Sequence, residues 1–292
     1  MCLSMYHSEC VMIIHNYIEY IDLDIRNKIQ ELLGEPLLNT RFKIPTKSII
    51  GVFKSSPLEA MNECIETAHM RGLSLIAITD HGSAMKYSAH EGYFEMSTRL
   101  PKLIEGLNVL FGCEMNIMNQ FGDVDLSAKT MSELDIVLAG IHARTPYCET
   151  GEAKNTTAII NAMMRHPKIN IITHPFRTEF PISICDVVQA AKECDVILEI
   201  NLVLLLEAIK YKTNNSFALI VDKTVELVSC MHSVGSRYII SSDAHYSSEI
   251  GIENEQYKIL IRELEIIPEY VLNDDINVLK SFIHSIIFDG DI

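Results

Sequence analysis

Near the C-terminal end of the sequence, an acidic and an imidazole side chain follow directly on a short apolar run. Tyr238-Ile239-Ile240 leads into Ser241-Ser242-Asp243-Ala244-His245. In an extended chain residues i and i+2 point the same way, so Asp243 and His245 are expected to face one point. A carboxylate and an imidazole in that arrangement suit a divalent transition metal. Because one Asp-x-His is often ordinary loop chemistry, the pattern needs support from the rest of the chain.

Four other apolar runs end in residues of the same kinds. These residues are His81, Glu114, His142 and His174, at or just after runs at 73–79, 109–111, 135–140 and 169–173. Four histidines and two carboxylates exceed what one four-coordinate ion needs, so more than one metal is expected. Zinc is favoured, with manganese and iron as alternatives. Four further histidines, His90, His166, His232 and His284, are expected to be solvated or packed residues.

A metal pair of this kind has a known use. Glu114 is the natural candidate for a carboxylate that bridges two cations. Two bridged cations lower the pKa of a bound water and hold the attacking and leaving oxygens of an in-line displacement at phosphorus. The donor set therefore favours metal-dependent phosphoester chemistry.

The segments between the apolar runs have helical spacing. Further strands are expected at 48–53 and 196–200, and helices at 57–72, 91–103, 155–164, 181–191, 204–235 and within 254–287. Asn155-Thr156 is expected to cap the helix at 155–164. Apolar strands that alternate with helices predict a parallel sheet covered on both faces. Without a Gly-x-Gly-x-x-Gly fingerprint, a barrel is favoured over a dinucleotide-binding sheet. Barrel chemistry lies at the C-terminal ends of the strands, which is where the candidate ligands fall.

The first 44 residues look separate from this α/β body. Residues 17–33 have helical spacing and end at Gly34-Glu35-Pro36. We predict an N-terminal helical extension over 1–44, which carries His7 and His15, and one α/β domain over 45–292.

Composition excludes several classes of protein. The net charge of the 292 residues is −15, the wrong sign for a protein that holds a nucleic-acid backbone over a broad surface. Eight dispersed cysteines without a CxxC pair favour a reduced, cytoplasmic protein over a disulfide framework. No segment approaches the roughly 20 apolar residues of a membrane span. Neither a nucleic-acid nor a membrane partner is expected, and nothing in the sequence indicates the oligomeric state.

Six motifs together resemble the PHP (polymerase and histidinol phosphatase) superfamily. They are Ile78-Thr79-Asp80-His81-Gly82, Gly112-Cys113-Glu114, Ala139-Gly140-Ile141-His142, Ile172-Thr173-His174-Pro175, Leu198-Glu199-Ile200-Asn201 and Ser242-Asp243-Ala244-His245. Gly122-Asp123-Val124-Asp125 and Lys154-Asn155-Thr156 make the likeness greatest to bacterial YcdX-type phosphatases. The resemblance spans about 45–285. It implies a distorted (β/α)7 TIM-like barrel that hydrolyses small phosphoesters at a site usually holding three metals.

One part of the family pattern is missing. The family opens with Asp-x-His-x-His at the end of its first strand, whereas residues 45–54 contain neither histidine nor carboxylate. By resemblance, Glu114, His142 and His174 form one complete ligand set. The sets that use Asp243 with Glu114, and His81 with His245, lose their remaining ligands. Fewer than three ions are therefore expected.

Several roles and functions stay open. We expect His81, Asp243 and His245 to position the substrate or a second ion, and Arg177 to bind phosphate at the rim. Lys47, or His7 or His15, is a weaker candidate to replace the lost ligands. The favoured function is metal-dependent hydrolysis of a small phosphoester. The alternative is a degenerate domain that binds metal or ligand without turnover, and a nuclease is disfavoured by the acidic charge.

Overall fold

A computed structural model describes residues 48–51, 58–86, 88–202, 204–205, 216–245, 247–251, 255–274 and 276–283. Several sequence-based expectations lie outside these residues. They are the extension over 1–44 with its helix at 17–33, Lys47, and His284. The boundary between the extension and the α/β domain therefore stays a prediction.

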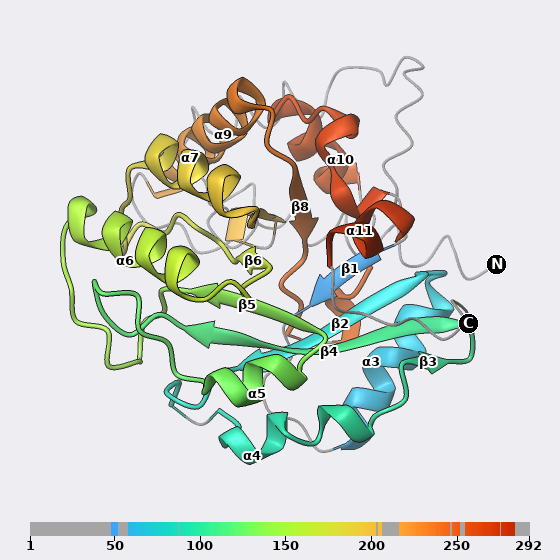
Figure 1. Ribbon diagram of the computed structural model, residues 1–292. Helices are drawn as coiled ribbons and strands as arrows, with labels where there is room; N and C mark the ends of the chain where they lie inside the picture. Colours follow the sequence, from blue (N-terminus) through green and yellow to red (C-terminus); the bar gives the residue numbers. More distant parts are fainter. Residues whose placement is uncertain are drawn as a thin grey trace.

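A curled parallel sheet forms the centre of the molecule (Figure 1). Its parallel strands, in both chain and spatial order, are β1 (Ser48–Gly51), β2 (Leu75–His81), β4 (Leu107–Asn116), β5 (Ile136–Gly140), β6 (Ile171–Ile172), β7 (Ile197–Asn201) and β8 (Tyr238–Ser241). A short antiparallel strand, β3 (Leu103–Ile104), pairs with the start of β4. The predicted α/β class and distorted TIM-like barrel are confirmed.

Helices connect the strands and cover the outside of the sheet. They are α3 (Leu58–Met70), α4 (Glu91–Phe94), α5 (Ala128–Glu133), α6 (Glu152–Arg165), α7 (Ile184–Cys194), α9 (Ser216–Val234), α10 (Glu255–Glu263) and α11 (Ile276–Phe282). Short 3₁₀ turns occur at η1 (Ser97–Arg99), η2 (Ser247–Glu249), η3 (Pro268–Tyr270) and η4 (Leu272–Asp274). Helices α6, α7 and α9 lie side by side along one flank (Figure 1).

Two predicted helical features are wrong. The helix expected over 91–103 is only α4 followed by η1, because Leu100 precedes Pro101 and adopts an extended conformation (φ −90°, ψ 140°). Helix α6 begins at Glu152, not at an Asn155-Thr156 cap. Asn155 instead accepts a hydrogen bond from the Tyr147 hydroxyl at 2.8 Å and donates to the Pro181 carbonyl at 3.0 Å, so its side chain ties together two loops.

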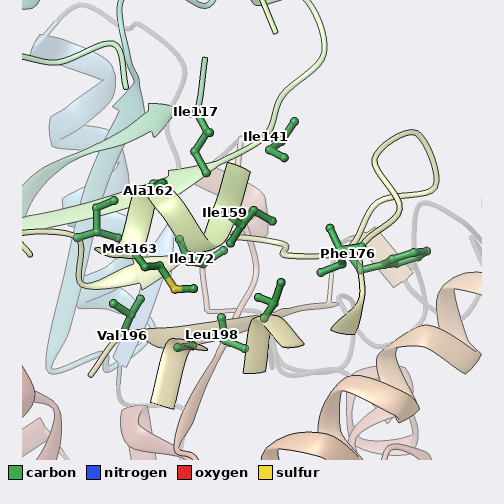
Figure 2. Packing of buried hydrophobic residues seen from close by; sticks show 14 of the residues in the cluster. Ile117, Ile141, Ile159, Ala162, Met163, Ile172, Phe176, Val196 and Leu198 are labelled. Atoms are coloured by element: carbon green, nitrogen blue, oxygen red, sulfur yellow. The ribbon is translucent and has the colours of Figure 1, made fainter. Parts of the chain in front are cut away.

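Alternation along the strands divides the core into an interior and an outer layer. One set of strand residues fills the barrel interior: Leu75, Ala77, Leu110, Ile136, Leu138, Ile171, Ile197 and Ile239. Leu272, Leu279 and Ile283 join this cluster from η4, α11 and the residue after α11, so the C-terminal segments close the barrel at the start of the strands. The alternate residues face the helices. Figure 2 shows Ile172 and Leu198 of the sheet near Ile159, Ala162 and Met163 of α6.

The edge strand β8 is covered by the segment that follows η3. Tyr238 forms a parallel bridge with Val271, and the Asn273 side chain hydrogen-bonds both the amide and the carbonyl of Ile240. These bonds occupy backbone groups on the outer edge of β8. In a closed barrel, β1 would pair with the same edge. The barrel is therefore completed on this side by the C-terminal segment.

Two of the dispersed cysteines meet across adjacent helices. Cys185 of α7 and Cys230 of α9 form a disulfide with Cα atoms 5.6 Å apart. The expectation that the cysteines are reduced is wrong for this pair. Their 45-residue separation carries no local signal, because only the packing of α7 on α9 brings the two sulfurs together.

None of the helices in the described part of the chain combines the length and the apolar character that a membrane crossing requires.

Gly112 lies in β4 where the neighbouring backbone leaves no room for a side chain. A Cβ there would come within 2.2 Å of the Ile136 carbonyl oxygen on β5. Because backbone cannot move aside cheaply, Gly112→Ala should lower the free energy of unfolding by about 1–3 kcal/mol. Gly92→Ala is the matched control, since its Cβ would meet only His90 Nδ1 at 3.6 Å. Urea denaturation of both variants measures the difference, and equal stabilities would contradict the expected clash.

Candidate metal centre

The strand alternation that fills the barrel interior also selects three of the candidate ligands. In β2, Leu75 and Ala77 point inward, and the same alternation reaches His81. In β4, Leu110 leads in the same way to Glu114. His81 and Glu114 are direct partners in the register of these two strands. In β5, Ile136 and Leu138 lead to Gly140 and then to His142, just beyond the strand.

His174 reaches the site by a different route. The alternation of β6 runs from Ile171 to Thr173, so a regular strand would turn His174 away from the interior. His174 instead adopts φ 27°, a left-handed conformation that is uncommon for a residue with a side chain. This local break brings its imidazole onto the same carboxylate as His142.

Four side chains converge on one buried point. His142 Nε2 lies 2.7 Å from Glu114 Oε1, His174 Nε2 lies 3.1 Å from the same oxygen, and the two imidazole nitrogens are 3.2 Å apart. His81 Nδ1 lies 3.7 Å from the other oxygen, Glu114 Oε2. All four residues are at most 7% exposed. Among the described residues, one group of at least three potential ligands has its donor atoms within 4.8 Å of one another, namely His81, Glu114 and His142.

The imidazoles control the charge state of Glu114. Burial by itself would raise the pKa of this carboxyl, but His81 and His142 hold it well below its ordinary value. Burial lowers the pKa of His142, which the Glu114 charge offsets only in part. Burial also acts to lower the pKa of His174, but the hydrogen bond and the charge of Glu114 outweigh burial, so the pKa of His174 is raised. The cluster thus holds an ionised carboxylate among imidazoles, the donor set of a metal centre.

One oxygen of the central carboxylate has no hydrogen-bond partner. Glu114 Oε2 is buried and accepts no hydrogen bond. A buried polar atom of this kind is normally satisfied by an ion or a water. Donor atoms about 2.1 Å from a tetrahedral ion lie roughly 3.4 Å apart. Since the nitrogens and Oε1 are 2.7–3.2 Å apart, small outward movements would make room, and the residues fit a divalent transition metal.

Two glycines allow this close approach. A Cβ on Gly140 would come within 3.2 Å of Cε1 of both His142 and His174, so the two rings pack directly over its backbone. A Cβ on Gly82 would come within 2.4 Å of the Asp125 carboxylate. That carboxylate accepts hydrogen bonds from the backbone amides of Ala84 and Asn116, both at 2.8 Å. Asp125 thereby joins the loop after His81 to the end of β4 beyond Glu114.

Asp243 and His245 are not arranged as an extended chain would place them. Asp243 has φ 48°, so the rule that residues i and i+2 face one way does not hold there. His245 Nδ1 lies 2.8 Å from the Asp243 backbone oxygen, and the His245 side chain is 30% exposed. Burial, followed by the charges of Glu114 and Glu199, raises the pKa of Asp243 to about 8. The two side chains still approach each other, with His245 Nδ1 3.9 Å from Asp243 Oδ1, and Asp243 is the more buried of the two.

The remaining candidates lie in other surroundings. His90 caps α4 by accepting the amide of Gly92, and His166 Nε2 lies 3.0 Å from the Gly122 carbonyl. His232 Nε2 is 3.1 Å from the Tyr238 hydroxyl. Arg177 is one-third exposed, with its Nε 3.8 Å from Glu179. Burial has the largest influence on the pKa of His142 and His174, and the charge of the Arg177 guanidinium also acts to lower both pKa values.

Sequence reasoning assigned no role to two polar residues of β7. Glu199 and Asn201 continue the interior alternation that begins at Ile197, and both are buried. Glu199 contacts Thr173, His174 and Ser241, and Asn201 contacts Asp243. The sequence did contain a sign of their involvement in the site, namely a glutamate and an asparagine two residues apart in an otherwise apolar strand.

The chain is similar in sequence to proteins named probable phosphatase. No family model matches the chain. A probable phosphatase of Thermoanaerobacter sp. strain X514 is 36% identical over 223 residues, which is 76% of this chain and 87% of that protein. A probable phosphatase of Shewanella sediminis strain HAW-EB3 is 33% identical over 227 residues, covering 76% and 86% of the two chains.

A solved structure shares the fold. The histidinol phosphate phosphatase of Lactococcus lactis, in complex with zinc, L-histidinol and phosphate, superposes with a TM-score of 0.50 at 13% sequence identity. The match covers 76% of this chain and 95% of that one. At this identity the likeness concerns the barrel itself.

Proposed function

The chain belongs to a family of PHP-like bacterial phosphatases, and on this premise we propose that it hydrolyses the phosphoester of a small molecule with the help of a divalent transition metal. The observation that carries the proposal is the convergence of His142 and His174 on Glu114, beside His81, at the C-terminal ends of the strands. Active sites of β/α barrels lie at this face.

Each residue has a proposed role. Glu114, His142 and His174 hold the metal, which when bound acts as a Lewis acid on the phosphoester and makes water a better nucleophile. His81, Asp243 and His245 position the substrate or a second ion. Arg177 binds the phosphate.

The metal content is proposed to be below the three ions usual for PHP enzymes. Strand β1 and the residues directly after it, 48–54, contain neither histidine nor carboxylate. The proposed set of two imidazoles and one carboxylate favours zinc, and manganese or iron is also compatible with it.

The absence of histidine and carboxylate from residues 48–54 also favours a second function. A chain without the first-strand ligands could bind metal or a phosphorylated ligand without turning it over. Metal analysis of the purified full-length protein, together with hydrolysis of p-nitrophenyl phosphate in added zinc, manganese or iron, separates the two functions. Hydrolysis that a chelator abolishes supports the enzyme. Bound metal without hydrolysis, from mildly acid to mildly alkaline pH, would leave only the binding function.

Arg177→Ala should raise the KM for a phosphomonoester by about 10- to 100-fold, since a charge-assisted hydrogen bond to phosphate contributes roughly 1.5–3 kcal/mol. Metal content should not change, because Arg177 donates no ligand atom. Arg165→Ala is the matched control, as its guanidinium pairs with Asp123 on the surface. An unchanged KM in Arg177→Ala would remove this residue from the phosphate site.

A further inference from the structure

We propose that β7, which supplies no metal ligand, positions the site residues that follow both neighbouring strands through Glu199 and Asn201. This inference rests on the proposed function, because it assigns the two residues a purpose within that site. Glu199 positions His174 at the end of β6, and Asn201 positions Asp243 at the end of β8.

Glu199 is a buried carboxylate that accepts hydrogen bonds from the two residues just after β6 and from the last residue of β8. Its Oε2 accepts the backbone amide of His174 at 2.6 Å and the Thr173 hydroxyl at 2.9 Å. Its Oε1 accepts the Ser241 hydroxyl at 2.5 Å. Glu199 is 2% exposed. A buried carboxylate is costly unless several donors satisfy it, so these bonds hold the three elements in one arrangement.

The bond to the His174 amide addresses a specific conformational problem. His174 must leave the alternation of β6 to bring its imidazole to Glu114, and it does so at φ 27°. Left-handed backbone at a residue with a side chain is strained and persists only where the surroundings enforce it. A charged acceptor fixed to the amide of that residue supplies such enforcement.

Asn201 makes the corresponding contact on the other side. It lies two residues after Glu199, so both side chains enter the interior from one strand. Asn201 Nδ2 donates to Asp243 Oδ2 at 3.0 Å, while its Oδ1 accepts the amide of Leu204 at 2.9 Å. Asp243 is the second residue of the site in a left-handed conformation, with φ 48°. The two strained residues of the site are thus each held by one side chain of β7.

A positioning role and a ligand role predict different results for the isosteric variant. In Glu199→Gln, the amide oxygen still accepts from His174 and Thr173, and the amide NH₂ can donate to Ser241, whose hydroxyl accepts as well as donates. Glu199→Gln should therefore keep its metal. Glu199→Ala removes every acceptor and should weaken zinc binding by about 10- to 100-fold, as observed for residues that orient ligands.

The measurement is zinc affinity by competition with a chromogenic chelator, together with the visible spectrum of the cobalt-substituted protein. We expect a changed cobalt spectrum in Glu199→Ala and a spectrum near that of the unmodified protein in Glu199→Gln. Glu193→Ala, on the exposed face of α7, is the control. Asn201→Ala should leave zinc affinity intact and alter KM or kcat, since it acts through Asp243. Thr173→Val gives a mild version of the Glu199 effect if Glu199→Ala fails to fold.

Each outcome decides the proposal. If Glu199→Gln and Glu199→Ala lose zinc affinity to the same extent, the negative charge itself is needed, and the positioning role is overturned. Unchanged zinc affinity and spectrum in Glu199→Ala, or in Thr173→Val where the alanine variant does not fold, would also overturn it. Because affinity and spectrum need no turnover, the Glu199 result stands even if the protein proves to hydrolyse no phosphoester.

Discussion

Glu114→Gln should abolish stoichiometric metal binding and lower phosphatase activity by roughly 1000-fold or more. Glu114 contacts the other three members of the cluster, through Oε1 to His142 and His174 and through Oε2 to His81, and it is the one carboxylate among these four residues. The amide of glutamine keeps the size of the side chain but lacks the charge that a cation requires. A structural zinc site contributes about 10–16 kcal/mol over its ligands, so losing the central one should cost several orders of magnitude in affinity.

Metal analysis after dialysis, and p-nitrophenyl phosphate hydrolysis, measure the two effects. Glu95→Gln is the matched control, because that glutamate lies on the surface beside Lys129. Circular dichroism of the metal-free protein shows whether the variant is folded. Full metal content in a folded Glu114→Gln would place the ion elsewhere and refute the proposed centre.

The second large effect separates the histidines of the cluster. His142→Ala and His174→Ala should each remove most of the bound metal, whereas His81→Ala should remove little. The Nε2 atoms of His142 and His174 lie within 3.1 Å of Glu114 Oε1, while His81 Nδ1 is 3.7 Å from the opposite oxygen. His81 is therefore suited to substrate or to a second, weaker ion, and its loss should affect turnover more than metal content.

Zinc titration of the three alanine variants measures this difference directly. His232→Ala is the control, since its imidazole lies against Tyr238 and Tyr270. The three donors His81, Glu114 and His142 lie within 4.8 Å of one another, so an ion centred on them is the competing arrangement. Equal metal loss in His81→Ala and His174→Ala would contradict the partition, and greater loss in His81→Ala would favour that competing arrangement.

Much of the fold was predictable because it depends on local pattern. Short apolar runs bounded by helical segments identified every strand of the parallel sheet, and their alternation with helices indicated a barrel. The prediction failed where a single local rule was overridden. The segment 91–103 breaks at Pro101, and Asn155 joins two loops where a helix cap was expected. A proline can follow a helix or interrupt one, and an asparagine can cap a helix or hydrogen-bond to a distant loop. The contacts with neighbouring residues determine which of these occurs.

The sequence by itself determined which residues stand at the ends of the strands, because strand periodicity and residue type are properties of the chain. It therefore pointed to His81, Glu114, His142, His174, Asp243 and His245. Only the tertiary structure decided how these side chains meet. The left-handed backbone at His174 and Asp243, the contacts of Glu199 with two neighbouring strands, and the Cys185–Cys230 disulfide all depend on residues 25 or more positions apart. Such contacts arise from the packing of the barrel, and no local pattern encodes them.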